Sequence, residues 1–181
     1  MIRVGWLLKI IPNMRYLIYK NKKGFSLIEV ILAVFVITIG ITGAVNLATY
    51  SISNVAVGKS QIIATNLSQE GLEIIRNIRD SNWLKDIDWN DGLKTDGDYR
   101  VQYNSLDLLD ISDSPALNID NTNPDYVVYL YDDGKPKSRF SRKISIANIN
   151  SYEIKVVSEV TWKERGHDYE VNAETRLYDW K

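Results

Sequence analysis

Residues 25–45 form one apolar run, FSLIEVILAVFVITIGITGAV, which constrains the fold more than any other feature of the chain. Fifteen of its 21 residues are aliphatic, Ala or Phe, and Glu29 is its one charged residue. A helix of this length extends about 31 Å, enough to span the hydrocarbon core of a bilayer. A core helix of a water-soluble domain would show a polar face, and this run has almost none. We therefore predict a membrane-spanning helix.

Charged residues are distributed unevenly around this run. Residues 1–24 carry six cations and no acid, whereas residues 25–181 carry 16 cations and 23 acids. Lys and Arg before a membrane helix favour the cytoplasmic side. We therefore predict a single-pass protein of the cytoplasmic (inner) membrane, with its N-terminus inside and its larger part outside. The six cations are Arg3, Lys9, Arg15, Lys20, Lys22 and Lys23.

A cleaved secretory signal peptide would also place cations before an apolar run. The run is longer than the usual apolar region of a signal peptide. The residues that follow it, Asn46-Leu47-Ala48-Thr49-Tyr50, lack the small-x-small pattern of a signal peptidase site. We therefore expect the apolar segment to remain on the protein.

Glu29 is the residue of this run that requires an explanation. A carboxylate inside an apolar membrane helix costs about 2.5–3.5 kcal/mol unless it is neutralised or paired. The next cation along the chain is Lys59, so the run contains no partner for it. A cut just before Phe25 would create a new α-amine, and the amine of a neighbouring subunit can pair with Glu29 and offset the desolvation cost.

The residues around Glu29 resemble a known processing site. The stretch Lys22-Lys23-Gly24-Phe25-Ser26-Leu27-Ile28-Glu29-Val30 is similar to the N-terminus of type IV prepilins and pseudopilins. The resemblance implies that a membrane prepilin peptidase cuts after Gly24 and methylates the new N-terminal Phe25, with Lys22 and Lys23 at the basic end of the leader. It also implies that Glu29 assists methylation and assembly by pairing with the N-terminus of a neighbouring subunit.

The same resemblance implies partners and no cofactor. The partners are the prepilin peptidase, other pilin subunits that contact the N-terminal helix, an inner-membrane assembly platform and membrane lipid. The chain departs from many members in its leader of 24 residues. Met14 offers a second start that would shorten the leader to 11 residues, and both starts stay open.

The periodicity of the remaining chain predicts one helix followed by strands. Ile63, Leu67, Ile74 and Ile78, with Gly71 between them, recur at helical spacing, and period-2 alternation follows after residue 97. We predict a pilin-like α+β fold, in which a long N-terminal helix packs on an antiparallel sheet. The predicted strands cover residues 99–104, 126–131, 139–149, 152–162 and 169–177, the last two joined by a hairpin at 163–167. The predicted domains are a leader (1–24), a membrane and assembly helix (25–48), its extension (49–83) and a sheet domain (84–181).

Several side-chain patterns in the predicted extension and sheet suggest sites only weakly. Glu73, Arg76 and Asp80 have the spacing of surface ion pairs on a helix. The stretch from Asp86 to Gly92 resembles a calcium loop, but its glycine is one position late and Gly97 stands where the bidentate Glu belongs, which favours a solvated turn. We interpret residues 110–125 as a flexible polar loop. Lys135, Lys137, Arg139, Arg142 and Lys143 surround Phe140; a solvated basic hairpin is the main interpretation and DNA binding the alternative.

The amino-acid composition gives little support for an enzymatic function. The chain has no cysteine and one histidine, which excludes disulfides, thiolate nucleophiles and multi-histidine metal centres. His167 falls in a predicted turn without a nucleophile motif nearby, so we interpret it as an exposed turn histidine. The main hypothesis is a filament subunit, a minor pilin or pseudopilin of a type IV pilus or a related secretion or DNA-uptake machine. The alternative is a signal-anchored surface binding protein with an extracytoplasmic β-rich domain and no filament role, and an enzyme ranks last.

Overall fold

The computed structural model describes residues 24–111 and 116–180, which form one long helix and seven strands. By their internal contacts, the described residues divide into two units, with the boundary between Ala48 and Thr49. The helix, α1, covers Leu27–Leu84. The strands are β1 (Gly97–Arg100), β2 (Leu109–Asp110), β3 (Ala116–Asp120), β4 (Val128–Leu130), β5 (Lys137–Asn150), β6 (Glu153–Glu164) and β7 (His167–Tyr178).

Local side-chain and backbone chemistry explains where α1 ends. The amide of Asp86 donates to the Trp83 carbonyl at 3.2 Å, and the amide of Ile87 donates to the Asn82 carbonyl at 3.1 Å. Asp86 itself has a φ of 57°. These two bonds around a left-handed residue form a Schellman cap, and Asp is one of the few residues other than Gly that tolerate this conformation. The helix therefore stops at Leu84, and the chain turns sharply into residues 85–96.

Strand β5 organises the sheet. One edge of β5 pairs with β6 over most of its length, and β6 pairs in turn with β7. The other edge of β5 is shared, because β1 pairs with residues 144–146 and β3 pairs with residues 137–141. Strands β2 and β4 extend β1 and β3 outward. The predicted antiparallel sheet is confirmed, and every pair is antiparallel.

The β6–β7 hairpin has a two-residue connection, Arg165-Gly166. Both residues have positive φ values, 52° and 84°, and the flanking residues Glu164 and His167 are paired. Two consecutive left-handed residues are typical of a type I′ turn, whose twist matches that of the adjoining strands. The hairpin was predicted at 163–167, and the strands run closer to the turn than we expected.

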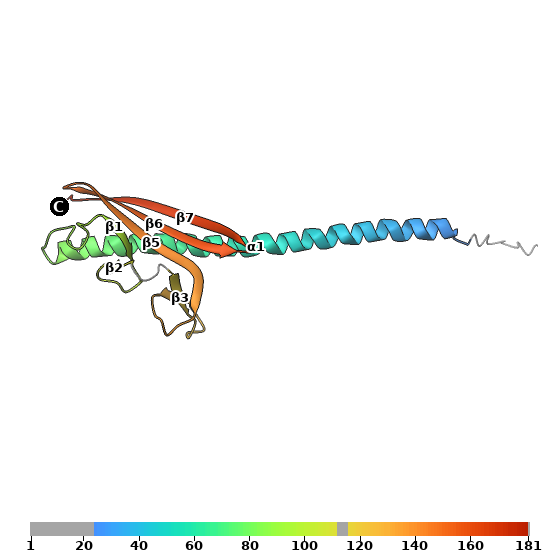
Figure 1. The fold of residues 1–181 in the computed structure, drawn as a ribbon, viewed down its shortest axis with the longest axis horizontal. Coiled ribbons are helices and arrows are strands. Elements are labelled where there is room, and N and C mark those ends of the chain that lie inside the picture. Colours follow the sequence, from blue (N-terminus) through green and yellow to red (C-terminus); the bar gives the residue numbers. More distant parts are fainter. Residues whose placement is uncertain (1–23, 112–115, 181) are drawn as a thin grey trace, which may run out of the picture. The chain divides into compact units, whose positions relative to one another are not determined.

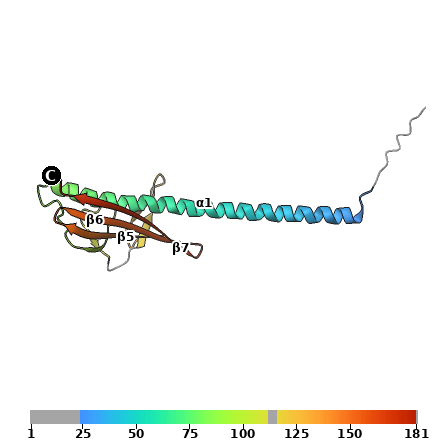
Figure 2. The ribbon, with the colours of Figure 1, turned by 90° about the horizontal axis from the view of Figure 1, so that it is seen from above.

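The core lies between the sheet and the part of α1 from Ser60 to Asn82, as Figures 1 and 2 show. Two clusters of buried side chains fill it. One surrounds Ile75, Ile146 and Ile154, and the other surrounds Leu67 and Phe140. The predicted apolar stripe of the helix is confirmed, and the α+β pilin-like arrangement with it. From Ile154 on, the buried residues of β6 alternate along the strand, at Ile154, Val156, Ser158, Val160 and Trp162.

Gly71 marks a close approach between α1 and the sheet. A Cβ atom at this position would lie 2.7 Å from Ser158 Oγ and 2.8 Å from Ile144 Cδ1. A third close atom, Arg142 Cδ, would lie 3.4 Å away. Small residues on both sides, Gly71 on the helix and Ser158 on β6, therefore allow the two layers to pack without a gap.

Replacing Gly71 with Val is expected to destabilise the fold by about 1–3 kcal/mol, because the added methyl groups overpack this contact. Thermal unfolding of the full chain in detergent, followed by circular dichroism, measures the effect. Gly58 is the matched control, since a Cβ at this helical position meets nothing within 4 Å. Gly58→Val should change stability by less than about 0.5 kcal/mol in either direction. Equal effects of the two substitutions would contradict this account.

Three details of the predicted sheet are wrong. The strand expected at 99–104 ends at Arg100, because residues 102–105 form a turn in which the Ser105 amide donates to the Gln102 carbonyl at 2.8 Å. The polar loop expected over 110–125 contains strand β3, which lies between β4 and β5. Tyr152, the first residue of the strand expected at 152–162, lies in the β5–β6 turn and is exposed, because β6 begins only at Glu153.

Candidate functional site

Gly24 and Phe25 lie just before the first turn of α1. Neither residue is in a helix or strand, and both are exposed, with Phe25 81% accessible. The helix begins after Ser26, whose carbonyl accepts hydrogen bonds from the amides of Glu29 and Val30 at 3.0 and 3.2 Å. A peptide bond in an exposed, irregular segment can enter a protease site without unwinding a helix. The geometry of the Gly24–Phe25 bond therefore suits cleavage.

The first part of α1 is apolar on all sides. Its apolar side chains stay at least half exposed, among them Ile31, Val36 and Ile41. The helix is long and apolar enough to cross a membrane, and none of its most apolar 18-residue window is buried in the protein. Exposing these apolar side chains to water would be strongly unfavourable in free energy, because none of them is buried within the protein. This segment is therefore a candidate membrane span.

Polar groups within this segment differ in how they are satisfied. The hydroxyl of Thr38 donates to the Phe35 carbonyl at 2.8 Å, and that of Thr42 donates to the Thr38 carbonyl. Such bonds back to the helix are compatible with an apolar environment. Within residues 24–111 and 116–180, the Glu29 carboxylate forms no hydrogen bond or ion pair. Glu29 is thus the charged group of the apolar run, and it has no partner within the described residues.

Glu29 also occupies a position that a helix N-terminus favours. Ser26 precedes the first helical residue and Glu29 is the third, which is the spacing of a capping box. A carboxylate in the first turn is further stabilised by the helix dipole. The start of α1 therefore has a local reason to contain Glu29, and this role must be separated from a role in assembly by experiment.

Comparison with known proteins identifies this segment. Residues 19–45 match the family model described as the prokaryotic N-terminal methylation motif. The chain carries the type IV prepilin-like signature. No curated protein and no solved structure matches the chain. The motif covers the junction and the apolar run, and it points to a structural protein of the pilin type rather than to an enzyme.

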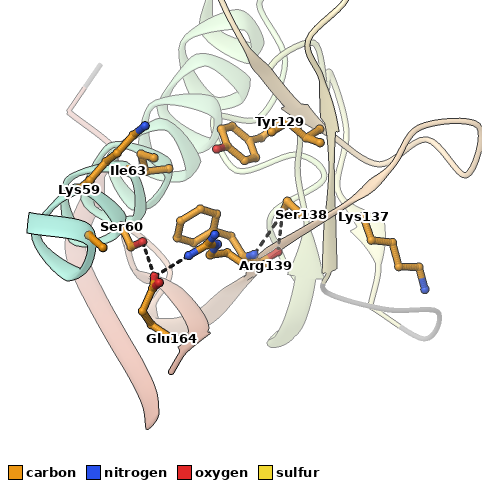
Figure 3. Close-up of a pocket in the computed structure, with 11 residues that line it drawn as sticks. Lys59, Ser60, Ile63, Tyr129, Lys137, Ser138, Arg139 and Glu164 are labelled. Atoms are coloured by element: carbon orange, nitrogen blue, oxygen red, sulfur yellow. Dashed lines mark hydrogen bonds and ion pairs between the residues drawn. The ribbon is translucent and has the colours of Figure 1, made fainter. Parts of the chain in front are cut away.

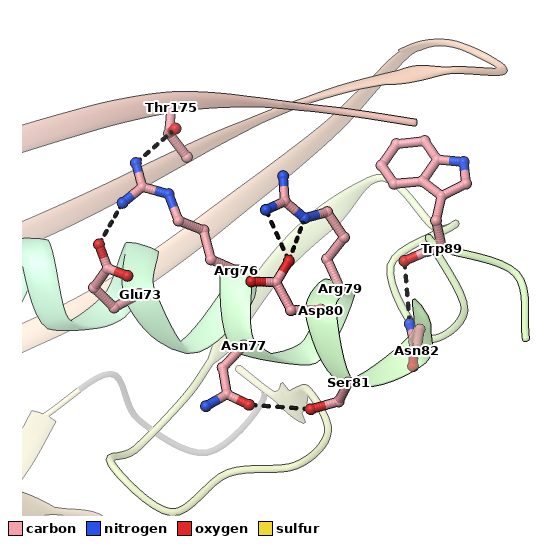
Figure 4. Close-up of polar contacts among 9 residues, drawn as sticks. All are labelled: Glu73, Arg76, Asn77, Arg79, Asp80, Ser81, Asn82, Trp89 and Thr175. Atoms are coloured by element: carbon pink, nitrogen blue, oxygen red, sulfur yellow. Dashed lines mark hydrogen bonds and ion pairs between the residues drawn. The ribbon is translucent and has the colours of Figure 1, made fainter. Parts of the chain in front are cut away.

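Polar contacts on the outer part of α1 only partly follow the predicted spacing (Figure 4). Arg76 pairs with Glu73, as expected, and also donates to the Thr175 hydroxyl at 3.0 Å on β7. The expected pair between Arg76 and Asp80 is wrong, because Asp80 pairs with Arg79 at 2.8 Å. The Nη2 group of Arg76 thus links helix α1 to strand β7.

Arg142 is the main correction to the predicted basic cluster. Its side chain is fully buried. Nη1 donates to the Leu67 carbonyl at 3.0 Å and to Glu70 Oε1 at 3.1 Å, and Nη2 donates to the Val101 carbonyl at 2.5 Å. The guanidinium therefore joins α1 to the segment after β1. Its place in the alternation of β5, between Phe140 and Ile144, is the signal in the sequence that could have revealed its burial.

The other expected cations of this cluster are mostly neutralised. Lys135 pairs with Asp120 at 3.0 Å, and Lys143 pairs with Glu159 at 3.4 Å. The main interpretation, a solvated basic hairpin, is wrong for Arg142. With one cation buried and others paired with carboxylates, little of the cluster is left to meet a phosphate backbone.

A groove lies beside this cluster, between α1 and the strands (Figure 3). It has a volume of about 440 Å³, and Ile63, Tyr129 and Phe140 form its apolar part. Arg139 donates to Glu164 at 2.5 Å, and the Ser60 hydroxyl donates to the same oxygen at 2.7 Å. The hydrogen bond from Ser60, followed by that from Arg139, lowers the pKa of the Glu164 carboxyl. We did not predict this groove, because its lining comes from segments far apart in the chain.

The remaining candidate residues have structural partners or lie on the surface. Asp86 belongs to the cap of α1, and Asp88 pairs with Lys94 at 2.6 Å, a hydrogen bond that lowers the pKa of Asp88. Across the part of the chain that the structure describes, no three His, Asp or Glu side chains are grouped so as to hold a metal ion. His167 is exposed and is the first residue of β7. Lys22 and Lys23 lie outside the described residues.

Proposed function

We propose that this chain is a structural subunit, a minor pilin or pseudopilin, of a type IV pilus or a related secretion or DNA-uptake filament. In this proposal prepilin peptidase cuts after Gly24, next to the basic residues Lys22 and Lys23, and methylates Phe25. Before assembly, the chain spans the cytoplasmic membrane with its N-terminus inside and its sheet domain outside. It then joins other pilin subunits at the assembly platform and enters a surface filament.

The observation that carries the proposal is the combination of an exposed Gly24–Phe25 junction with a Glu29 carboxylate that lacks a partner in the described chain. The methylation motif over the same residues supports it. The pilin-like α+β arrangement, with a helix long enough to continue from a membrane span into a sheet domain, supports it as well. Pairing Glu29 with the amine of a neighbouring subunit would offset the desolvation cost of both groups.

Mass spectrometry of the membrane-extracted protein tests the processing step. In cells with prepilin peptidase we expect a chain that starts at N-methyl-Phe25. Gly24→Val should leave the leader attached, because the peptidase would meet a branched side chain at the bond it cuts. Gly40→Val is the matched control, since a Cβ at Gly40 meets nothing within 4 Å, and it should be processed normally. An intact leader on the unmodified chain in such cells would refute the proposal.

A signal-anchored binding protein is the second candidate. The groove beside Tyr129 and Phe140 is the observation that favours it, since an open groove with apolar and charged walls can hold a ligand. The two candidates differ at the N-terminus. An anchored binding protein would keep its leader, and Glu29→Gln would leave its location and function unchanged.

A further inference from the structure

The tip of the β6–β7 hairpin brings a cation to a part of α1 that has no charge of its own. Between Glu29 and Lys59 the chain contains no charged residue. Arg165, the first residue of the two-residue hairpin connection, is exposed, and its Nη1 group donates a hydrogen bond to the Ser53 hydroxyl on α1. Both residues belong to the unit that follows Ala48, so the contact is internal to that unit. The hairpin therefore holds a guanidinium beside α1, six residues before its first lysine.

The two carboxylates near this tip have cations of their own. Glu164 accepts a hydrogen bond from Arg139 at 2.5 Å (Figure 3), and Asp168 lies 3.7 Å from the ammonium group of Lys163. Within residues 24–111 and 116–180, Arg165 forms no ion pair, and its side chain donates only to the serine hydroxyl. A hydroxyl is neutral, so this bond positions the guanidinium without cancelling its charge. The other N–H donors of Arg165 remain available for a ligand.

The tip also lies close to the C-terminal end of the apolar run. Ser53 follows Val45, the last residue of the run, by eight residues, which is about 12 Å of helical rise. The headgroup region of a bilayer takes up about 5–8 Å of this distance. The remainder is shorter than the Debye length of about 8 Å at physiological ionic strength. A cation held at Ser53 therefore interacts with lipid headgroups with little screening by salt.

Tyr50 lies between these two positions and fits the same environment. Its side chain is 67% accessible. Tyrosine is enriched where a membrane helix leaves the hydrocarbon core, because its ring is apolar and its hydroxyl is polar. The segment between the apolar run and Ser53 thus has the composition of a membrane interface.

We propose that Arg165, at the tip of the β6–β7 hairpin, binds the phosphates of anionic phospholipids in the membrane that the apolar run spans. The bilayer is the partner that the chain itself brings to this surface, since the run that enters it ends eight residues before Ser53. A guanidinium binds phosphate oxygens through paired N–H donors. This inference rests on the membrane topology in the proposed function, and it adds that the sheet domain docks on the membrane surface before the subunit joins a filament.

Quenching by a labelled lipid tests the contact, because the chain has no cysteine of its own. The full chain with His167→Cys carries a small fluorophore beside the tip, at a residue that is exposed. It is placed in nanodiscs that contain a phosphatidylcholine with a nitroxide on its headgroup. Replacing part of the unlabelled phosphatidylcholine with phosphatidylglycerol should raise the ratio of docked to undocked domains about fivefold, the effect of one cation near an anionic surface. Salt at about 1 M should remove most of this gain.

A second label position controls for the distribution of the nitroxide lipid. Leu84 is 89% accessible, and α1 rises about 46 Å from Ser53 to this residue. A fluorophore on Leu84→Cys should be quenched weakly, and to the same extent with and without phosphatidylglycerol.

Substitutions of Arg165 separate its charge from its structural role. Arg165→Gln keeps a donor for the Ser53 hydroxyl and removes the charge, so it should abolish the gain in quenching. Arg165→Lys keeps the charge and should retain most of the gain. The matched control is Lys85→Gln, which removes one exposed cation just after the end of α1 and should leave the gain unchanged. Circular dichroism checks that each variant is folded.

The outcomes distinguish the inference from the proposed function. Equal quenching at residue 167 with and without anionic lipid would overturn the contact, and so would a gain that persists in Arg165→Gln. Either result leaves the proposed function in place if chains start at Phe25 and form filaments. Chains that keep their leader and form no filaments would refute the proposed function, and lipid-dependent quenching would still establish the contact. A chain that does not insert into the nanodiscs would overturn both.

Discussion

Replacing Glu29 with Gln is expected to lower filament yield at least 30-fold, while cleavage after Gly24 continues. Removing one partner of a buried charge pair costs about 2 kcal/mol or more, because the other charge is left without a counterion. In the proposed assembly that charge is the α-amine of a neighbouring subunit, which cleavage before Phe25 would create. Electron microscopy and pelleting of sheared filaments measure the yield, and mass spectrometry of the membrane pool confirms processing.

Glutamine is chosen because it separates assembly from helix capping. Gln fills the third position of a capping box as Glu does, so the start of α1 stays intact. Ser26→Ala is the complementary control, since it weakens the cap and keeps the carboxylate; it should cost about 1 kcal/mol of local helix stability and leave filaments largely intact. Normal filaments from Glu29→Gln chains would show that the carboxylate serves the helix N-terminus and not assembly.

Replacing Arg142 with Ala is expected to lower the free energy of unfolding by about 3–5 kcal/mol. The substitution empties a fully buried position and leaves the Glu70 carboxylate and the Val101 carbonyl without their donor. It also separates α1 from the segment after β1, which the guanidinium joins. Thermal or urea unfolding of the full chain in detergent, followed by circular dichroism, measures the loss.

Two further variants show which property of Arg142 matters. Arg142→Lys keeps the charge but cannot reach both carbonyls with one planar group, so an intermediate loss is expected. Lys155→Ala is the control for a partly exposed cation, because its pair with Glu174 at 2.9 Å is open to solvent and should contribute less than about 1 kcal/mol. Similar losses for Arg142→Ala and Lys155→Ala would contradict the role that we assign to Arg142.

The elements that follow simple periodic patterns could be predicted from the sequence. The apolar run and the stripe from Ile63 to Ile78 predicted one long helix that becomes amphipathic, and Ile78 is buried as expected. The alternation in residues 152–177 predicted strands β6 and β7, of 12 residues each. Both predictions rest on an apolar pattern that repeats several times along the element, at helical spacing in α1 and at every second residue in the strands. A single exception such as Tyr152 therefore does not obscure the pattern.

The residues that break a pattern could not be placed in the same way. Strand β3 has only five residues, among polar neighbours, and it is held by its pairing with β5, which lies far along the chain. Arg142 was assigned to the surface because a charge is rarely buried, and only its partners Leu67 and Val101, 75 and 41 residues away, explain its position. The groove could not be predicted for the same reason, because only the tertiary fold brings Ile63 of α1 beside Tyr129 and Phe140 of the strands.

Strand β5 gives one of its edges to two strands, β1 and β3, with the stretch from Val101 to Ile111 leaving between them. The chain leaves this edge of β5 at the end of β1 and returns to it at β3, whereas β6 pairs with the other edge of β5. Val101 is buried and residues 109–110 form β2, but most side chains of residues 103–107 are exposed. Because exposed segments tolerate added length at small entropic cost, residues 103–107 are a place where related chains can differ in size without refolding. The Leu106–Asp107 bond, exposed on both sides, offers a natural point for a genetically encoded label.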